Sequence, residues 1–313
     1  MTGVKIESQI PVVDLSLADF KPGTDAWNCA REVAMRALEE NGCFIVEFGE
    51  GGVPSGLHDA VFKVTEEFFN LPHKTKILNT NFKPSHGYIP HVPGTPLLEG
   101  SNIDGAEKLN ACEKFTHLMW PSGNDGFCET VHSYSKLIVE IEKMVMKMIV
   151  ESYGVESFYN EYLESSTYLL RFLKYKKPQQ DYNPIAHTDK SFLSYLHQDK
   201  VRGLEIMTKD GSWFTYEPSP TSFMVMAGDA CVAWSNGRIK ACYHRVAVRE
   251  EKIRYSIGTF SYQTGNIEIP KEFIDDAHPR QFKDFNHIDF LCFYDSKTNP
   301  IKAESLIKAY CGV

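Results

Sequence analysis

The sequence predicts an all-β core with flanking helices, in which short strands form a sandwich or a barrel. The second half of the chain carries short β-rich segments separated by turn signals such as Asn236-Gly237, a pattern typical of these folds. The first half instead shows apolar residues at the 3.6-residue spacing of amphipathic helices. The 313 residues are 42% hydrophobic and 12% aromatic, which indicates a large packed core rather than disorder.

The first seventy residues predict two strands and two helices. Alternating or short apolar runs indicate the strands, and apolar residues at helical spacing indicate the helices. Asn41-Gly42 supplies a stop for the first helix, and Leu71-Pro72 supplies one for the second. The expected elements are a strand at 10–16, a helix at 25–40, a strand at 43–46 and a helix at 57–69.

The middle of the chain predicts an irregular segment and a long helix. Residues 79–112 are rich in Gly, Pro and Asn without a steady period, and such segments are often functional. Residues 131–152 carry an apolar stripe followed by Gly154, which predicts a helix whose methionines fill the core. We expect a mixed α/β region over 1–120, packed as one unit on a β core over 121–313 that ends in a helical tail.

From residue 168 onward the chain predicts a series of short strands. Turn signals such as Lys209-Asp210-Gly211 separate them. The expected strands are 168–175, 192–196, 203–207, 213–216, 222–227, 230–234, 243–248 and 254–262.

Composition disfavours several classes of partner. The formal charge is −8 with no basic run, so neither nucleic acid nor an acidic membrane is expected to bind. No apolar signal core or bilayer-length apolar segment is visible. The eight cysteines are scattered without a Cys-x-x-Cys pair, so free thiols in the cytoplasm are expected, with the nucleus as the alternative. Nothing requires more than a monomer.

A candidate metal site lies at His187-Thr188-Asp189. Residues i and i+2 of a strand point the same way, so His187 and Asp189 can share one face. His244 can return beside them through the folding of the intervening strands. Two histidines and one carboxylate suit ferrous iron, because they leave coordination positions open for oxygen and a co-substrate. His-x-Asp alone is a weak signal, since both residues are common in polar loops.

A second constellation follows His244. Arg254 and Ser256 are again i and i+2, so both face one side of an expected strand. A guanidinium fork and a hydroxyl fit one end of a small dicarboxylate. A structural ion pair is the alternative, because a half-buried Arg is costly unless it is paired.

These motifs, in this order and at these spacings, resemble the plant 2-oxoglutarate- and Fe(II)-dependent dioxygenases. Further segments are similar to the same family across nearly the whole chain. Within the family, the chain looks closest to the glucosinolate-biosynthesis type; steroidal-alkaloid hydroxylases and auxin-oxidising dioxygenases are similar relatives. The further segments that match the family are Ile10–Ser16, Gly42–Val46, Phe68–Pro72 with Lys74, and His86–Tyr88. The segments that resemble the glucosinolate type are Phe20–Gly23, Asn79–Thr80, Lys83–Tyr88 and Trp234–Arg238.

The resemblance implies a double-stranded β-helix, or jelly roll, and a cofactor set. His187, Asp189 and His244 would bind Fe(II), and 2-oxoglutarate would serve as co-substrate, with ascorbate expected to stimulate turnover. Tyr175 would join Arg254 and Ser256 at the distal carboxylate of 2-oxoglutarate, although it also reads as an ordinary strand aromatic. Leu173 departs from the family, which often has Asn there. With O2, the implied outcomes are hydroxylation, demethylation, desaturation or ring closure of a small molecule, with release of succinate and CO2.

The substrate pocket is expected to be aromatic and to lack a second cation. Such a pocket suits a neutral or weakly basic, largely apolar ring compound, such as an alkaloid or steroid derivative. His197 also reads as a structural histidine, and His91 as a surface-loop residue. Three alternatives stay open: an iron oxidase without 2-oxoglutarate, a hormone-oxidising (auxin-like) dioxygenase, and a non-catalytic metal-binding jelly roll. The candidate substrate residues are Tyr88, Phe115, Phe192, His197, Phe260 and Tyr262.

Overall fold

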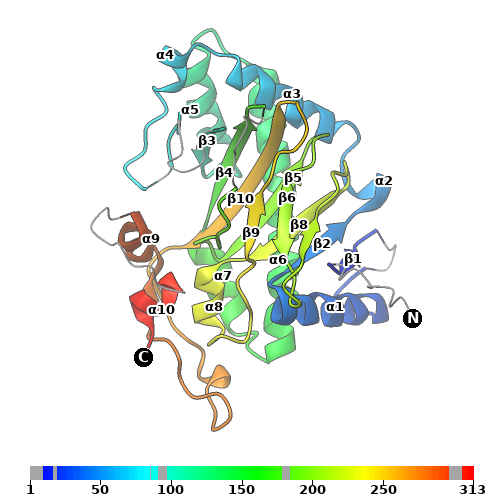
Figure 1. Ribbon diagram of the computed structural model, residues 1–313, viewed down its shortest axis with the longest axis vertical. Helices are drawn as coiled ribbons and strands as arrows, with labels where there is room; N and C mark the ends of the chain where they lie inside the picture. Colours follow the sequence, from blue (N-terminus) through cyan, green and yellow to red (C-terminus); the bar gives the residue numbers. More distant parts are fainter. Residues whose placement is uncertain (1–9, 17–19, 85, 91–96, 178–183, 296–304) are drawn as a thin grey trace.

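A seven-stranded sheet forms the centre of the protein in this computed structural model (Figure 1). The structure describes residues 10–16, 20–84, 86–90, 97–177, 184–295 and 305–313. Only β1 and β2 pair in parallel, and the other neighbours are antiparallel. The strands, in spatial order, are β1 (Val12–Asp14), β2 (Cys43–Glu47), β8 (Ser222–Ala227), β5 (Leu193–Gln198), β10 (Arg254–Gln263), β4 (Ser166–Tyr175) and β3 (Leu98–Asp104).

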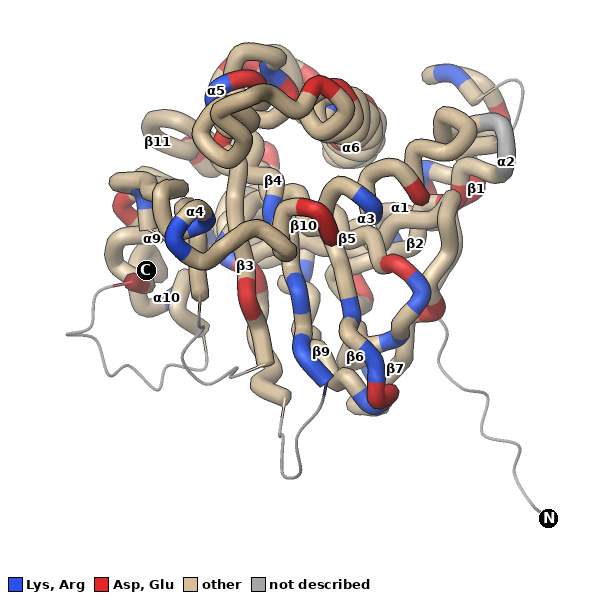
Figure 2. Tube along the Cα trace, turned by 90° about the horizontal axis from the view of Figure 1, so that it is seen from above, with Lys and Arg blue, Asp and Glu red and all other residues tan. Residues whose placement is uncertain are grey.

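A smaller sheet faces this major sheet. It contains β7 (Trp213–Thr215), β6 (Leu204–Met207) and β9 (His244–Val246), paired antiparallel in that order. Figure 2 shows these strands on one side of the major sheet and helices on the other. The expected all-β core with flanking helices is therefore confirmed.

The helices cover the outer face of the major sheet. One hydrophobic cluster joins them to strand residues that point outward, such as Phe172 of β4 and Ile257 of β10. A second cluster fills the space between the two sheets and includes Leu173, Leu196 and Ile206. Because side chains alternate along a strand, strands such as β4, β5 and β8 contribute to both clusters. The covering helices are α1 (Asp25–Asn41), α3 (Leu57–Phe69), α5 (Leu109–Met119), α6 (Asp125–Tyr153) and α7 (Phe158–Ser165).

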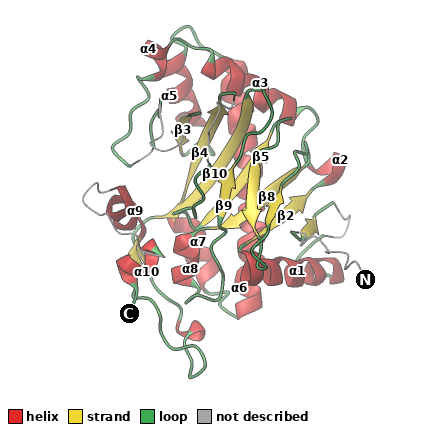
Figure 3. Cartoon of the chain, viewed as in Figure 1, coloured by secondary structure: helices red, strands yellow, loops and turns green. Residues whose placement is uncertain are grey.

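The C-terminal segment packs at one end of the sheets (Figure 3). His287 at the start of α9 (His287–Asp295) contacts the Lys190 carbonyl oxygen at 2.8 Å and accepts from the Gln263 N–H at 3.1 Å. Leu291 of α9 packs in a third hydrophobic cluster with Leu169, Phe260 and Tyr262. The remaining elements are α2 (Gly49–Gly52), α4 (His73–Lys76), α8 (Asp229–Trp234), β11 (Asn266–Ile267), η1 (Lys271–Phe273), β12 (Phe285–Asn286) and α10 (Leu306–Cys311).

Two of the expected elements differ from the structure. The segment expected as a strand at 230–234 is the helix α8, whose residues Ala230, Cys231 and Trp234 are fully buried. A short apolar run does not reveal its period when every side is buried. The segment 79–112 is not irregular throughout, because it contains β3 and the start of α5. Among the described residues, none of the helices combines the length and apolar character needed to cross a membrane.

Candidate active site

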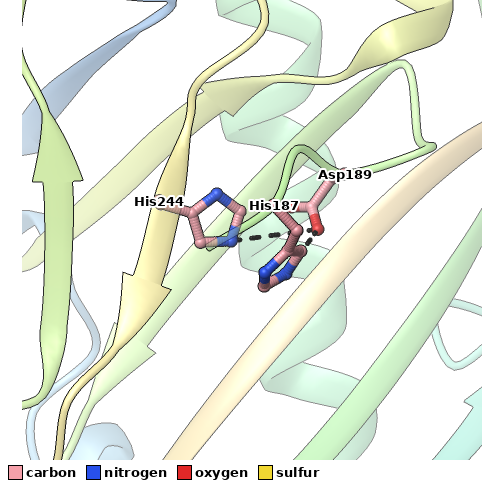
Figure 4. A group of neighbouring side chains, drawn as sticks. All are labelled: His187, Asp189 and His244. Carbon is pink, nitrogen blue, oxygen red and sulfur yellow. Dashed lines mark ion pairs between the residues drawn. The ribbon is translucent and has the colours of Figure 1, made fainter. Parts of the chain in front are cut away.

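His187, Asp189 and His244 converge at the edge between the two sheets. His187 and His244 exchange backbone hydrogen bonds of 2.9 and 3.0 Å in an isolated β-bridge. Their side chains and that of Asp189 point toward one another (Figure 4). Oδ1 of Asp189 lies 3.9 Å from Nε2 of His187 and 4.0 Å from Nε2 of His244. These separations are too long for hydrogen bonds, but one cation can bridge the three atoms, which all lie within 4.8 Å of one another.

The chemistry of this triad fits a divalent metal. Oδ2 of Asp189 is buried and has no hydrogen-bond partner among the described residues. Partial removal of the ring from water, together with the neighbouring His244, lowers the pKa of His187 to about 4. Burial raises the pKa of Asp189, but His244 and His187 outweigh it, so the net pKa lies below its usual value. Neutral imidazole and ionised carboxylate are the forms that bind metals.

Backbone carbonyls orient both imidazoles. Nδ1 of His244 lies 3.1 Å from the Cys242 carbonyl oxygen, and Nδ1 of His187 lies 3.4 Å from that of Ile185. A proton on each Nδ1 leaves Nε2 free to bind the metal, as in many metal sites. The His187 side chain is 50% exposed, whereas Asp189 and His244 are largely buried. The triad is therefore open to solvent on the side of His187.

Arg254 occupies a preformed polar cradle between the two sheets. It is fully buried, and its Nη1 donates to Oγ of Ser256 at 2.9 Å while its Nη2 donates to Oε1 of Gln198 at 2.6 Å. The guanidinium lies over the Tyr175 ring, 4.9 Å from the centroid. A Cβ at Gly203 would approach Nε of Arg254 to 2.7 Å, so only glycine fits there without a shift.

Strand β6 connects the cradle to the triad. The Leu204 N–H donates to Oε1 of Gln198 at 3.1 Å, and Ile206 pairs with His244. Two residues of a strand span about 6.6 Å, which is the scale of a small dicarboxylate. The structure thus brings together all six residues predicted for iron and co-substrate binding.

Four predicted substrate residues do not reach this site. His197 precedes the inward-facing Gln198, so alternation turns it to the helix side, where its Nε2 lies 3.0 Å from Nδ1 of His58. Phe115 packs on Phe68 and Phe127 beneath the helices. The predictions for these two residues are wrong.

Phe192 and Tyr88 need the same correction. Phe192 packs between Tyr162 and Trp234 on the helix side. The Tyr88 hydroxyl donates to Glu99 at 2.7 Å, and the same carboxylate oxygen binds Lys76 of α4. These four residues were assigned to the substrate pocket from the family resemblance, but the direction of each side chain depends on local alternation and packing. His91 lies outside the described residues.

Phe260 and Tyr262 do lie on the inner face, beside residues that the sequence analysis missed. Arg171 lies over the Phe260 ring, 4.9 Å from its centroid, and His86 lies 5.6 Å from the Tyr262 ring. The expectation of a pocket without a second cation is therefore wrong. Arg171 and Tyr175 are four residues apart on one expected strand, so alternation predicts that their side chains share a face. The position of Gln198 beside Arg254 could not be predicted in this way, because it depends on the register between two strands.

Comparison with known families decides the identity of the site. The 2OG-Fe(II) oxygenase superfamily model matches residues 162–262, and a model for the non-haem dioxygenase in morphine synthesis N-terminal region matches residues 10–125. The probable 2-oxoglutarate-dependent dioxygenase AOP1.2 of Arabidopsis thaliana is 40% identical over 318 residues, covering 98% of this chain and 97% of that protein. This chain belongs to the 2-oxoglutarate- and Fe(II)-dependent oxygenase superfamily.

Solved structures agree with this membership. The rice dioxygenase for auxin oxidation is 27% identical with a TM-score of 0.79, covering 97% of this chain and 100% of that one. The Arabidopsis thaliana dioxygenase for auxin oxidation 1, in its 2-oxoglutarate complex, is 27% identical with a TM-score of 0.77, covering 87% and 100%. The jelly roll and the resemblance to plant dioxygenases are confirmed. This oxygenase is an oxidoreductase whose cofactors are Fe(II) and 2-oxoglutarate.

Proposed function

We propose that this oxygenase hydroxylates, demethylates or desaturates a small, largely apolar ring compound at the site between the two sheets. The observation that carries the proposal is that β6 contacts both the triad, through the pairing of Ile206 with His244, and the Arg254 cradle, through the Leu204 N–H and Gln198. The alkaloid or steroid skeleton expected from the sequence rested on a pocket without a second cation. Arg171 removes that premise.

In this proposal His187, Asp189 and His244 hold the iron. When bound, Fe(II) and 2-oxoglutarate supply the oxidising chemistry, in which O2 converts 2-oxoglutarate to succinate and CO2 while the substrate is oxidised. The chain fixes the two imidazoles through backbone carbonyls. The half-exposed side of the triad, at His187, gives access from solvent.

Arg254, Ser256 and Tyr175 bind the distal carboxylate of 2-oxoglutarate in this proposal. The Arg254 side chain is fully buried, and a charge is stable in the interior only when it is paired and hydrogen-bonded. Ser256 and Gln198 orient the guanidinium. Its planar fork presents N–H donors that can bind both oxygens of a carboxylate.

The substrate would rest on the apolar surface beyond the triad. Phe260 and Tyr262 of β10 pack there with Leu169 and with Leu291 of α9. Aromatic and aliphatic walls with a few polar groups are typical of small-molecule pockets. Because Leu291 of α9 packs against these residues, the C-terminal segment would take part in excluding water from the substrate.

Hormone oxidation is the second candidate. It is favoured by the two solved structures described as dioxygenases for auxin oxidation, each covered along its full length by this chain. An auxin offered as substrate separates the candidates, because only a hormone oxidase will couple its loss to succinate formation. We further propose that the protein acts as a monomer in the cytoplasm, where its eight free thiols would stay reduced.

The direct test of activity is incubation with Fe(II), ascorbate, 2-oxoglutarate and a plant metabolite extract. Mass spectrometry would detect gain of an oxygen atom, loss of a methylene unit or loss of a hydrogen pair, and succinate would be measured in parallel. Substrate change without loss of 2-oxoglutarate would favour an oxidase that does not use this co-substrate. Absence of both changes with every extract would count against the proposal.

A further inference from the structure

Asp189 lies on a loop and not on a strand. This loop, residues 188–192, follows the β-bridge of His187 and ends where β5 begins; we call it the ligand loop. Aspartate has a short side chain, so the position of its carboxylate follows the position of its backbone closely. The geometry of the metal triad therefore depends on the contacts that hold the ligand loop in place.

Every carbonyl group of residues 189–192 accepts a hydrogen bond. Residues 228–230, which lead into α8, donate their backbone N–H groups to three of these carbonyls at 2.8 to 3.3 Å. The fourth carbonyl, that of Lys190, is bound by a side chain instead, because Nε2 of His287 in α9 lies 2.8 Å from its oxygen. The ligand loop is thus held by the backbone of one helix and by one side chain of another.

The Lys190 side chain adds further contacts to both helices. Its Nζ donates to Oδ2 of Asp229 in α8 at 2.7 Å and to the Thr188 carbonyl oxygen at 2.8 Å. It also lies over the ring of Tyr294 in α9, 5.2 Å from the centroid. The side chains of this ion pair are only 12% and 7% exposed. Lys190, next to the ligand Asp189, is therefore the residue through which α8 and α9 both hold the loop.

The two hydrogen bonds of His287 define its tautomer. A backbone N–H can only donate, so Nδ1 of His287, 3.1 Å from the Gln263 nitrogen, must accept. The proton of the neutral ring is then on Nε2, from which it is donated to the Lys190 carbonyl oxygen. The ring is fully buried, and burial lowers the pKa of His287 to about 4, in keeping with a neutral ring. A neutral histidine thus joins the end of β10 to the ligand loop.

The same helix also contacts the substrate end of the proposed site. The His287 ring lies 5.1 Å from the Tyr262 ring. Leu291, one helical turn further along α9, packs in one cluster with Phe260 and Tyr262. Helix α9 is therefore fixed on β10 by apolar packing, and from there it places His287 against the ligand loop.

We infer that His287 is a positioning residue of the iron site, which holds the ligand loop through the Lys190 carbonyl oxygen so that Asp189 faces the two histidines of the triad. The inference rests on the proposed function, because it takes Asp189 as an iron ligand. His287 itself contacts neither the metal nor the substrate. Without its hydrogen bond the ligand loop loses one of its two supports, and Asp189 is less well placed to bind a metal.

Two amide substitutions separate the two hydrogen bonds of His287. Asparagine places its oxygen near the position of Nδ1 but is too short to reach Lys190, whereas glutamine can place its amide nitrogen near the position of Nε2. His287→Asn should therefore keep an acceptor for Gln263 and lose the donor to Lys190, and His287→Gln should keep that donor. Phe290→Leu is the matched control, because Phe290 is buried in the same helix and packs on Tyr310 of α10.

Titration of the protein with Co(II) alone tests the metal site without turnover, because the visible absorption of this ion depends on its ligands. We expect His287→Asn to bind Co(II) at least about tenfold more weakly than the wild type, since loss of a group that orients metal ligands typically costs about 10- to 100-fold. His287→Gln and Phe290→Leu should bind nearly as well as the wild type. Normal affinity in His287→Asn, equally weak binding by both His287 variants, or a comparable loss in Phe290→Leu would each overturn the inference.

Kinetics at saturating Fe(II) separate positioning of the loop from general loosening of the fold. The KM for 2-oxoglutarate should stay unchanged in His287→Asn, because Arg254 and Gln263 are at opposite ends of β10. A parallel rise in that KM would assign the effect to a disturbed fold and contradict the positioning role. Urea unfolding of the metal-free proteins would verify that each variant is folded.

Failure of the proposed function gives a different result. If the wild-type protein binds Co(II) but forms no succinate from 2-oxoglutarate, the proposed function fails, whereas the affinities of the His287 variants still decide the role of this residue. If the wild type is active and His287→Asn binds Co(II) normally, only the inference fails. Absence of Co(II) binding by the wild type would overturn both.

Discussion

The side-chain oxygen of Gln198 accepts a hydrogen bond of 2.6 Å from Nη2 of Arg254 in the buried space between the sheets. The same amide is fixed in turn, because its nitrogen donates to the Tyr216 carbonyl oxygen and its oxygen also accepts from the Leu204 N–H. The orientation of the guanidinium is therefore set by β5 and β6 before any ligand binds. Such preorganisation reduces the cost of binding.

Gln198→Leu should weaken the binding of 2-oxoglutarate while leaving iron affinity unchanged. Loss of a hydrogen bond to a charged group costs about 1.5–3 kcal/mol, so the KM for 2-oxoglutarate should rise roughly 10- to 100-fold. The measurement is succinate formation at varied 2-oxoglutarate. Thr259→Val is the control, because Thr259 lies on the opposite face of β10. An unchanged KM for 2-oxoglutarate in Gln198→Leu would show that the hydrogen bond to Gln198 does not help Arg254 to bind this ligand.

Arg254→Ala should raise the requirement for 2-oxoglutarate far more than that for the main substrate. Loss of one partner of a desolvated charged pair costs roughly 2–5 kcal/mol, or about 30- to several-thousand-fold. Arg254→Lys should rescue little, because an ammonium cannot reproduce the planar fork. Steady-state kinetics with each ligand varied in turn would measure both requirements. Equal increases for the two would contradict the assignment of Arg254 to the co-substrate.

Phe260→Leu should affect substrate binding, whereas Phe192→Leu should affect the stability of the fold. Phe260 lies under Arg171 on the inner face, so its loss should raise the substrate KM with little effect on 2-oxoglutarate. Phe192 packs between Tyr162 and Trp234, so its loss should lower the free energy of unfolding by about 1 kcal/mol or more without a change in KM. Kinetics and urea unfolding of both variants would measure this. A larger KM effect in Phe192→Leu would restore that residue to the substrate pocket.

Glu142 should make the stability depend on pH. It is buried in α6 beside Tyr162, and burial raises its pKa from the usual 4.5 to about 7, although hydrogen bonds from Tyr162, Ser261 and Tyr195 oppose the shift. Between pH 4.5 and about pH 7, Glu142 is therefore protonated in the folded state and ionised in the unfolded state. Its stabilisation is fully present below the unfolded pKa and is lost as pH rises through the folded pKa.

Glu142→Gln should remove this component, because the amide is neutral at every pH. Relative to the wild type, the variant should gain roughly 3 kcal/mol between about pH 4 and pH 8, as a difference of one in pKa corresponds to about 1.4 kcal/mol. Urea unfolding of both proteins across this range is the measurement. Other titrating groups cancel in the difference. If the free energies of unfolding of the two proteins differ by the same amount at every pH, Glu142 does not titrate in this range.

The sequence predicted the elements whose patterns are local. The helix at 57–69 and the strand at 222–227 match α3 and β8 residue for residue. The pairs His187–Asp189 and Arg254–Ser256 were predicted from strand alternation alone. The structure brings the members of each pair together, although His187 lies in an isolated β-bridge and Asp189 lies outside the strands. The division of the chain at residue 120 stays a prediction.

The rest of the site depends on packing between distant segments. Gln198 reaches Arg254 only through the register of β5 against β10. His197, its neighbour, was assigned to the pocket although it faces the helices. Alternation along the strand that carries Tyr175 could have indicated the face of Arg171, but its neighbours Asn102 and Phe260 come from strands far apart in the chain.

The most direct test of the account is anaerobic titration of the protein with Fe(II) and 2-oxoglutarate, followed through the visible absorption of the iron chelate. The wild-type protein should bind one iron, and the absorption should appear only when both ligands are present. Asp189→Ala should lose iron and absorption together, whereas Arg254→Ala should keep the iron and need more 2-oxoglutarate. Normal iron binding and absorption in Asp189→Ala would contradict the assignment of His187, Asp189 and His244 as the metal centre.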